Sequence, residues 1–440
     1  MRAALADPRP TLDRARSALA ALAALRGAPV DLDEVRDVVV IASSSRGGSS
    51  VFAELLRGVP GLSHLQAELN PFVLLAGAGP YESGHGDDHL SGGDPVDEEL
   101  WAREVGLDVG APAAVVGADP AEDLDALAGA IAARLVLQWP DLGLPPGELW
   151  AALRAALGAL AAAGGGRLPP AGPLHRALLS RLGSRWPGLD PWFYDLDPAL
   201  LRDAGPPPAV PPGPVPIEEP PFVTVGPWRR GLFGPLVIKT PSNCHRLDWL
   251  AARFPRARLR VLHLVRNPAA AINGLVDGWL FRGFHSHALA APLAGALGAA
   301  LRPGDRGHWK YDLPPGWAAL RRAPLALVAA HQWASAHDAA LLWLEAHPAV
   351  PRLTVRFEQV VGEADEQTAA LTAVADFLGL PEPGPLLRQA RGALPVVMAT
   401  AAPRARRWFS RATALEDALA TSGVRSVVDR LQLGDPEGWR

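Results

Sequence analysis

The sequence predicts an α/β fold in which a parallel sheet is flanked by helices and carries a largely helical insertion. Short, continuous apolar runs alternate with helical patterns, which is typical of a parallel sheet covered on both faces. A long stretch of Ala-rich helical patterns, broken by glycine and proline, separates the first such unit from the second. We therefore expect residues 1–80 and 222–440 to form one α/β domain and residues 81–221 to form a helical and proline-rich insertion.

Four apolar runs are the predicted strands, and a helical pattern follows each of them. The first run leads through a polar, Gly-rich turn into a helix that begins near Val51. The last leads into a long helix that Gly379 and Pro381 should stop. The predicted strands span residues 38–41, 236–239, 261–265 and 353–357.

The composition excludes several classes of protein. Lys+Arg total 42 and Asp+Glu total 46, so no global basic field favours a nucleic-acid partner. No apolar run approaches the roughly 18 residues of a membrane span, and we interpret the short apolar run between Arg16 and Arg26 as a surface helix rather than a signal peptide. The single cysteine, Cys244, suits a reducing compartment, which favours a cytoplasmic location. A bias to Ala, Gly, Arg and Pro, with Lys239 and Lys310 as the only lysines, indicates a GC-rich bacterial genome.

The polar turn after the first strand is a candidate anion site. Amides at a helix N-terminus lack intrahelical partners, and the helix dipole favours negative charge. Glycines allow close approach of the backbone, serines supply hydroxyls, and an arginine adds a permanent cation. The expected ligand is a phosphate or a sulfate, and the residues expected to bind it are Arg46, Gly47, Gly48, Ser49 and Ser50.

Two other interpretations of this turn stay open. A nucleotide-dependent kinase with a P-loop requires the pattern G-x-x-x-x-G-K-[ST]. Here Ser43 stands in place of the first glycine and Ser49 in place of the lysine, which counts against a kinase. A catalytically silent nucleotide-binding protein of the same fold is the alternative from a different class.

A second anion site is predicted where the strand at 261–265 ends. Arg266 follows this strand directly, and the next helix begins after Asn267-Pro268. An arginine can bind a phosphate through two parallel hydrogen bonds while the helix N-terminus shares the charge. The two strand ends are expected to line one crevice, because parallel strands end at the same edge of a sheet.

These segments resemble the sulfotransferases that use 3′-phosphoadenosine 5′-phosphosulfate. Residues 45–50 resemble the 5′-phosphosulfate loop of that family, and residues 262–275 resemble its 3′-phosphate motif. Residues 238–241 are similar to a Lys-x-Pro strand end in the bacterial members. Further similarity lies in residues 355–358, which resemble a Tyr-Glu-Asp-Leu segment, and in the Phe-Leu-Gly-Leu sequence at 377–380.

The sequence also departs from the family pattern. Gly274 stands where a serine is usual in the 3′-phosphate motif, and we expect Asn273 to substitute for it. Val51-Phe52 follows the hydroxyl pair where tryptophan is frequent, and Arg46 stands where lysine is frequent. Arginine can still neutralise a developing sulfuryl transition state, but it cannot donate a proton at neutral pH.

The resemblance implies a P-loop-like fold and transfer of a sulfonate group from 3′-phosphoadenosine 5′-phosphosulfate to a hydroxyl or amine of a small-molecule acceptor. A sulfuryl group carries less negative charge than a phosphoryl group, so we expect fixed cations to suffice without a metal. Arg46 and Lys239 are predicted to contact the sulfonate and bridging oxygens, and Arg266 to contact the 3′-phosphate. Nothing in the sequence identifies the acceptor or the oligomeric state.

The acceptor also needs a general base, for which Glu68 is the leading candidate. A carboxylate on a helix surface is an equally good interpretation of Glu68, and His64 is the alternative base. His263 lies in an apolar strand and is predicted to be a core histidine. His285 and His287 form an H-x-H pair that lacks the further ligands a metal site needs.

Three further segments carry weaker predictions. Residues 277–284 and 308–317 combine aromatic and charged side chains, which suits either an acceptor pocket or loop packing against the core. Residues 403–411 form the densest basic run, either a solvated face or a loop that closes over the nucleotide. In the second case, Arg404 and Arg407 are the expected nucleotide ligands.

Overall fold

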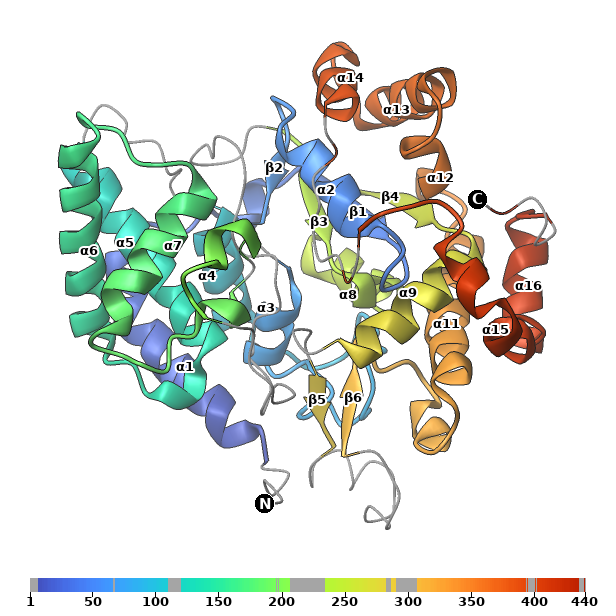
Figure 1. Ribbon diagram of the computed structural model, residues 1–440, viewed down its shortest axis with the longest axis horizontal. Coiled ribbons are helices and arrows are strands. Elements are labelled where there is room, and N and C mark those ends of the chain that lie inside the picture. The colour runs from blue at the N-terminus through green and yellow to red at the C-terminus, as the bar shows by residue number, and fades with distance from the viewer. Residues whose placement is uncertain are drawn as a thin grey trace.

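The computed structural model has a five-stranded parallel sheet at its centre, with helices on both sides (Figure 1). It describes residues 7–65, 68–109, 120–194, 196, 198–205, 234–281, 286–289, 307–392, 394, 400, 402–434 and 439. The strand order β2-β3-β1-β4-β7 places the first strand in the middle, with a loop and a helix after it. The predicted α/β, P-loop-like architecture is confirmed. The strands are β1 (Asp37–Ala42), β2 (Ser63–His64), β3 (Leu236–Lys239), β4 (Arg258–Val265) and β7 (Arg352–Arg356).

The parallel pairing brings the carboxyl ends of the strands to one edge of the sheet. Lys239, the last residue of β3, lies opposite Ile41 near the end of β1. The neighbouring strand β4 ends one residue before Arg266. The loop after β1, Lys239 and Arg266 therefore meet at the edge where open parallel sheets bind ligands.

Helices cover each face of the sheet through a separate hydrophobic cluster. On one face, Val39 and Ile41 pack with α2, α13 and α14. On the other, Val38 and Val40 pack with α3, α8 and α11. Burial on both faces explains why the strands read as continuous apolar runs. These helices are α2 (Ser49–Arg57), α3 (Asn70–Leu75), α8 (Leu247–Arg253), α11 (Leu325–Ala346), α13 (Ala364–Leu378) and α14 (Gly384–Arg391).

A lobe of helices extends the second cluster away from the sheet (Figure 1, left). Its helix α1 contacts α5 and α6 and buries Leu12, Leu19 and Leu22. The predicted N-terminal surface helix is therefore exposed on one side only, because its leucines recur at helical spacing and form a buried stripe. The proline-rich residues 206–221 lie outside the described residues. The lobe contains α1 (Arg9–Leu22), α4 (Glu98–Val109), α5 (Pro120–Gln138), α6 (Pro146–Ala163) and α7 (Ala171–Gly183).

A third cluster forms around α9 and α11 beside the sheet. It buries Trp279, Trp309 and Trp317, so these tryptophans of the two aromatic segments pack in a core. Two short antiparallel strands, β5 and β6, lie next to it. The remaining elements are α9 (Pro268–Leu280), α12 (Phe357–Val360), α15 (Ala412–Leu419), α16 (Ser422–Arg430), β5 (Ser286–Ala288), β6 (His308–Lys310), η1 (Ala23–Leu25), η2 (Leu32–Glu34), η3 (Pro140–Leu142), η4 (Pro191–Phe193), η5 (Pro198–Leu201), η6 (Pro241–His245), η7 (Trp317–Leu320) and η8 (Arg407–Arg411).

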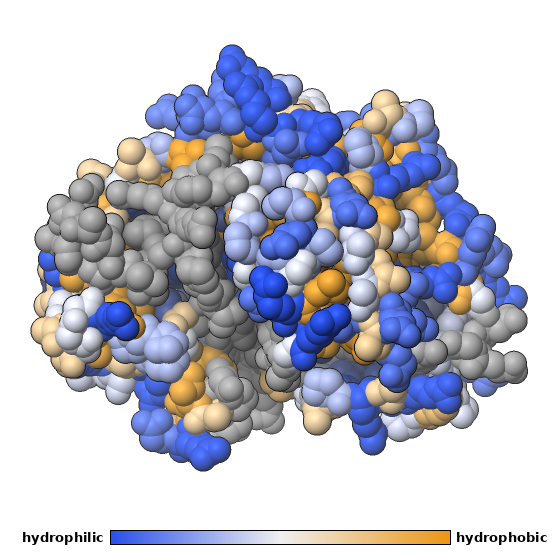
Figure 2. Space-filling view, turned by 90° about the horizontal axis from the view of Figure 1, so that it is seen from above, coloured by the Kyte–Doolittle hydropathy of each residue, from blue (hydrophilic) through white to orange (hydrophobic). Residues whose placement is uncertain are grey.

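Among the described residues on the face seen from above, hydrophilic ones predominate, with smaller hydrophobic areas between them (Figure 2). Among the helices of the described residues, none combines the length and hydropathy needed to cross a membrane.

Candidate anion-binding site

The loop between β1 and α2 has a tight backbone that requires glycine at two positions. Gly48 has a φ of 92°, and a β-carbon there would lie 2.7 Å from Cγ of Phe357. A β-carbon at Gly47 would lie 2.8 Å from the carbonyl oxygen of Ser44. Arg46 also has a left-handed backbone, with a φ of 62°, which is uncommon outside glycine. The sequence therefore folds here into a compact turn directly before the helix.

This turn exposes the N-terminus of α2 at the edge of the sheet. The helix begins at Ser49, and amides in its first turn lack intrahelical acceptors by the geometry of a helix. Ser49 is buried and Ser50 is half-buried. Two hydroxyl oxygens of the turn, Ser43 Oγ and Ser44 Oγ, are buried without a hydrogen-bond partner among the described residues. Unsatisfied donors beside a helix N-terminus suit an anionic ligand.

Arg266 lies directly against this loop. Its Nη1 donates a hydrogen bond to the carbonyl oxygen of Arg46 at 3.2 Å, and its guanidinium sits 5.3 Å from the ring centre of Phe357. Burial lowers the pKa of Arg266 to about 10, Glu358 opposes the shift, and the charges of Arg46 and Arg407 add to it. Arg266 stays protonated at neutral pH. The charges of Arg46 and Arg407 therefore repel that of Arg266, and a bound anion would reduce this repulsion.

Glu358 fixes the start of the helix that follows Arg266. Its Oε1 accepts hydrogen bonds from the backbone N–H of Asn267 at 3.0 Å and from Asn267 Nδ2 at 2.8 Å. Asn267 Oδ1 in turn accepts from the N–H of Ala270 and caps α9. Asn267 is a functional residue that was not predicted from the sequence, although asparagine before proline at a strand end is a helix-start signal.

In the second half of the predicted 3′-phosphate motif, Gly274 and Asn273 contact two different arginines. A β-carbon at Gly274 would lie 3.2 Å from Cβ of Arg46, so this glycine faces the loop arginine. Asn273 instead accepts a hydrogen bond from Arg411 Nη1 at 2.9 Å. The predicted substitute for the missing serine is thus already engaged with the basic C-terminal run.

Two arginines of that run are attached to α9, whereas a third is not. Arg407 and Arg411 both form ion pairs with Asp277 of α9. The charge of Arg46 contributes to a lowered pKa of Arg407, after the larger effect of burial, so the two guanidinium groups are near one another. Arg404 is exposed. The structure therefore brings Arg407 to the loop and leaves Arg404 at the surface.

Lys239 and Glu68 form a buried ion pair at the same edge. The segment after Glu68 is attached to the strand end, because the N–H of Leu69 donates to Thr240 Oγ1 at 2.7 Å. Burial raises the pKa of Glu68, although the charges of Lys239 and Arg57 oppose the rise. Glu68 Oε2 is buried and has no hydrogen-bond partner among the described residues. The prediction of a surface carboxylate was wrong, and one oxygen of Glu68 has capacity to accept a proton.

The predicted histidines have different environments. Burial and the charge of Arg57 lower the pKa of His64 to about 3, so His64 is neutral at pH 7 and a weak proton acceptor. His263 is buried and hydrogen-bonded to His337 at 2.9 Å, which confirms it as a core histidine. His287 is hydrogen-bonded to Tyr81, and its predicted partner His285 lies outside the described residues. Within the parts of the chain that the structure describes, no group of three or more His, Cys, Asp or Glu residues could hold a metal ion.

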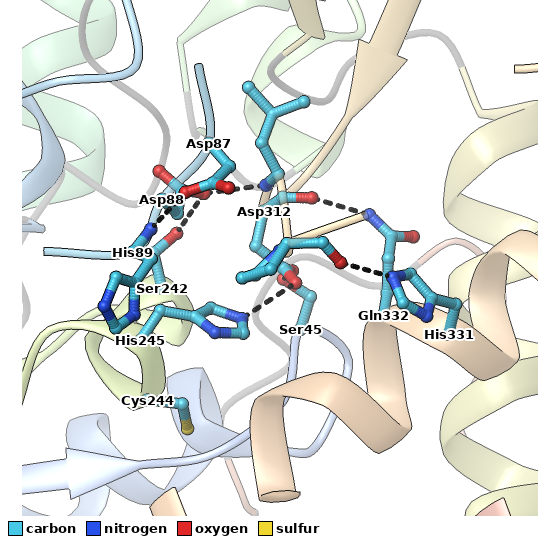
Figure 3. A network of polar contacts seen from close by, with 12 residues as sticks. Ser45, Asp87, Asp88, His89, Ser242, Cys244, His245, Asp312, His331 and Gln332 are labelled. Atoms are coloured by element: carbon cyan, nitrogen blue, oxygen red, sulfur yellow. Dashed lines mark hydrogen bonds and ion pairs between the residues drawn. The ribbon is translucent and has the colours of Figure 1, made fainter. Parts of the chain in front are cut away.

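A buried polar network behind the loop was missed by the sequence analysis (Figure 3). Ser45 Oγ donates a hydrogen bond of 2.8 Å to Oδ1 of Asp312, which is 267 residues away in the sequence. On the same side, Cys244 Sγ donates to the carbonyl oxygen of Ser43 at 3.3 Å. No local pattern could reveal these contacts, because the fold alone brings the partners together.

Comparison with known proteins gives only distant neighbours. The chain matches no family model and no curated protein sequence. A sulfotransferase domain from the curacin biosynthetic pathway has 14% identity and a TM-score of 0.36, over 91% of this chain and 99% of that domain. A sulfotransferase domain from the Synechococcus PCC 7002 olefin synthase has 16% identity and a TM-score of 0.34, over 92% of this chain and 98% of that domain.

Proposed function

We propose that the protein is a sulfotransferase that moves a sulfonate group from 3′-phosphoadenosine 5′-phosphosulfate to a hydroxyl or amine of a small-molecule acceptor. The observation that carries the proposal is the contact between the two predicted anion sites. Arg266 Nη1 lies 3.2 Å from the carbonyl oxygen of Arg46, at the ends of adjacent strands. One nucleotide with an anionic group at each end can therefore reach both sites.

The donor would be bound mainly by fixed positive charge. The amides at Gly48 and the start of α2, with the hydroxyls of Ser49 and Ser50, would contact the 5′-phosphosulfate. The N–H of Gly47 already donates to the carbonyl oxygen of Ser44 at 3.0 Å, so Gly47 would contribute the close approach of its backbone. Arg266 would contact the 3′-phosphate, with Arg407 beside it. Arginine suits this role because its planar guanidinium pairs with two phosphate oxygens at once.

Sulfonate transfer would be an in-line displacement. The acceptor oxygen or nitrogen forms a bond to sulfur while the bond from sulfur to the 5′-phosphate oxygen breaks and its electron pair stays with the phosphate. Arg46 and Lys239 would stabilise the sulfonate and bridging oxygens. The acceptor proton would pass to Oε2 of Glu68, whose raised pKa makes its carboxylate a stronger base. These fixed cations supply the charge that a metal ion would supply in phosphoryl transfer.

Titration calorimetry tests this function against its rivals. We expect 3′-phosphoadenosine 5′-phosphate to bind equally well with and without magnesium, and a radiolabelled donor to transfer sulfonate to some member of an acceptor panel. Preference for ATP with magnesium would instead identify a kinase. Tight binding of the donor with no transfer across a broad panel would favour a silent nucleotide-binding protein.

A further inference from the structure

The loop that would bind the donor is attached to a carboxylate from a distant part of the chain. Ser45 immediately precedes Arg46, and its hydroxyl donates to Asp312 Oδ1 at 2.8 Å (Figure 3). Both groups are buried, and the Asp312 side chain has only 1% of its surface exposed. Asp312 follows β6, which packs in the third hydrophobic cluster, around Trp279, Trp309 and Trp317, rather than in the central sheet.

Asp312 is fixed independently of the loop. Its carbonyl oxygen accepts hydrogen bonds of 2.9 Å from both Trp309 Nε1 and Gln332 Nε2. The N–H of the next residue, Leu313, donates to Asp88 Oδ2 at 2.7 Å. Since the backbone around Asp312 is held from two sides, its carboxylate serves as the anchor and Ser45 as the group that is held.

The burial of Asp312 is not explained by packing alone. Its Oδ2 has no hydrogen-bond partner among the described residues, and the nearest cationisable group is His245 Nε2 at 3.8 Å. Neither ring nitrogen of His245 has a hydrogen bond in the same part of the chain. A buried carboxylate with one hydroxyl donor is unfavourable compared with an apolar side chain. Such a group is expected where it has a task other than stability.

We propose that Asp312 is a positioning residue for sulfonate transfer. Its carboxylate holds Ser45 and thereby the left-handed backbone of Arg46, so that the guanidinium and the amides beside it meet the donor in the required orientation. The proposal rests on the proposed function. It predicts that the hydrogen bond to Ser45, rather than the charge of Asp312, is the contribution that matters.

Four variants test this role: Asp312→Ala, Asp312→Asn, Ser45→Ala and the double variant Ser45→Ala/Asp312→Ala. We expect each alanine change to lower kcat/KM for the donor by about 10-fold, the upper end for one hydrogen bond without a contribution from charge. The double variant should be no worse than either single one, because both remove the same interaction. Asp312→Asn should stay within about 3-fold of the wild type, since its amide oxygen can still accept from Ser45.

A matched control separates positioning from stability. Asp108 is another buried aspartate, paired with Arg134 in the helical lobe, and Asp108→Ala should lower the urea midpoint without changing kcat/KM. The role of Asp312 is overturned if the effects of Ser45→Ala and Asp312→Ala multiply, or if Asp312→Asn is as impaired as Asp312→Ala. Ser45→Ala and Asp312→Asn keep the test valid should Asp312→Ala not fold. A wild-type protein that neither binds the nucleotide nor transfers sulfonate would instead refute the proposed function itself.

Discussion

Replacing Gly48 with alanine should lower the free energy of unfolding by about 2–4 kcal/mol. Two effects add up at this position. The left-handed backbone, with a φ of 92°, disfavours any β-carbon by about 1 kcal/mol. A β-carbon would also overlap the ring of Phe357, whose Cγ would be 2.7 Å away. Overpacking of this kind adds about 1–3 kcal/mol.

Gly379→Ala is the matched control, because it has the first effect without the second. Gly379 ends α13 with a φ of 70°, and a β-carbon there would meet no atom within 4 Å. Its replacement should cost about 1 kcal/mol. Urea unfolding of the two variants in the same buffer measures the difference. Equal destabilisation by the two substitutions would refute the packing argument.

Gly48→Ala should also weaken nucleotide binding. The guanidinium of Arg266 lies 5.3 Å from the ring centre of Phe357. Displacement of this ring would therefore move Arg266, the residue predicted to bind the 3′-phosphate. We expect Gly48→Ala to weaken binding of 3′-phosphoadenosine 5′-phosphate by at least about 10-fold, a little over 1 kcal/mol. Gly379→Ala should leave this affinity unchanged in calorimetry. A loss of stability in Gly48→Ala with unaltered affinity would separate Phe357 from the site.

Four other substitutions test single side chains. Arg266→Ala should weaken nucleotide binding about 10- to 100-fold in calorimetry, which is the range for a charged hydrogen bond. Arg46→Ala should chiefly lower kcat. An affinity equal to that of the wild type in Arg266→Ala would show that Arg266 does not bind the 3′-phosphate. Glu68→Gln should lower kcat by about 10²- to 10⁴-fold and abolish the acidic limb of the rate profile, without loss of nucleotide affinity. Burial, with a smaller effect of Arg134, lowers the pKa of His175 to about 3, so its neutral form is favoured in the folded state. The stability that neutral His175 contributes is complete above pH 6.5 and is lost as the pH falls towards 3, at up to about 1.4 kcal/mol per pH unit. In urea unfolding between pH 7 and 4, the free energy of unfolding of His175→Gln should therefore decline less steeply than that of the wild type.

Sequence reasoning predicted the strands of the sheet where burial on both faces leaves a continuous apolar run. The predicted strand at 236–239 matches β3, and the run at 38–41 lies within β1. It missed β2, because Ser63 and His64 are polar and too short a pair to give a pattern. The helix that Gly379 was expected to stop does end at Leu378.

The candidate site was predictable only where its residues follow a strand end. Arg46 and Arg266 could be recognised in this way, since parallel strands bring their carboxyl ends together. The link from Ser45 to Asp312 could not, because it depends on how β6 packs against the sheet. The sequence of the basic run does not indicate that Arg407 lies near the loop while Arg404 is exposed. This difference depends on the ion pair of Arg407 with Asp277, which lies on a different helix.

One departure from the sulfotransferase pattern, the glycine at 274, has a steric explanation. The family frequently has lysine in the loop and serine eight residues after the motif arginine, where this chain has Arg46 and Gly274. A β-carbon at Gly274 would lie 3.2 Å from Cβ, 3.8 Å from Nε and 3.9 Å from Cγ of Arg46. A serine would therefore crowd Arg46 at its Cβ, an atom that lysine shares, so the contact accounts for the glycine at 274 but not for the arginine at 46. The contact of Asn273 with Arg411 uses Oδ1, so the Nδ2 amide remains the predicted substitute for the serine hydroxyl, and the charges of Arg46 and Arg407 lie beside Arg266.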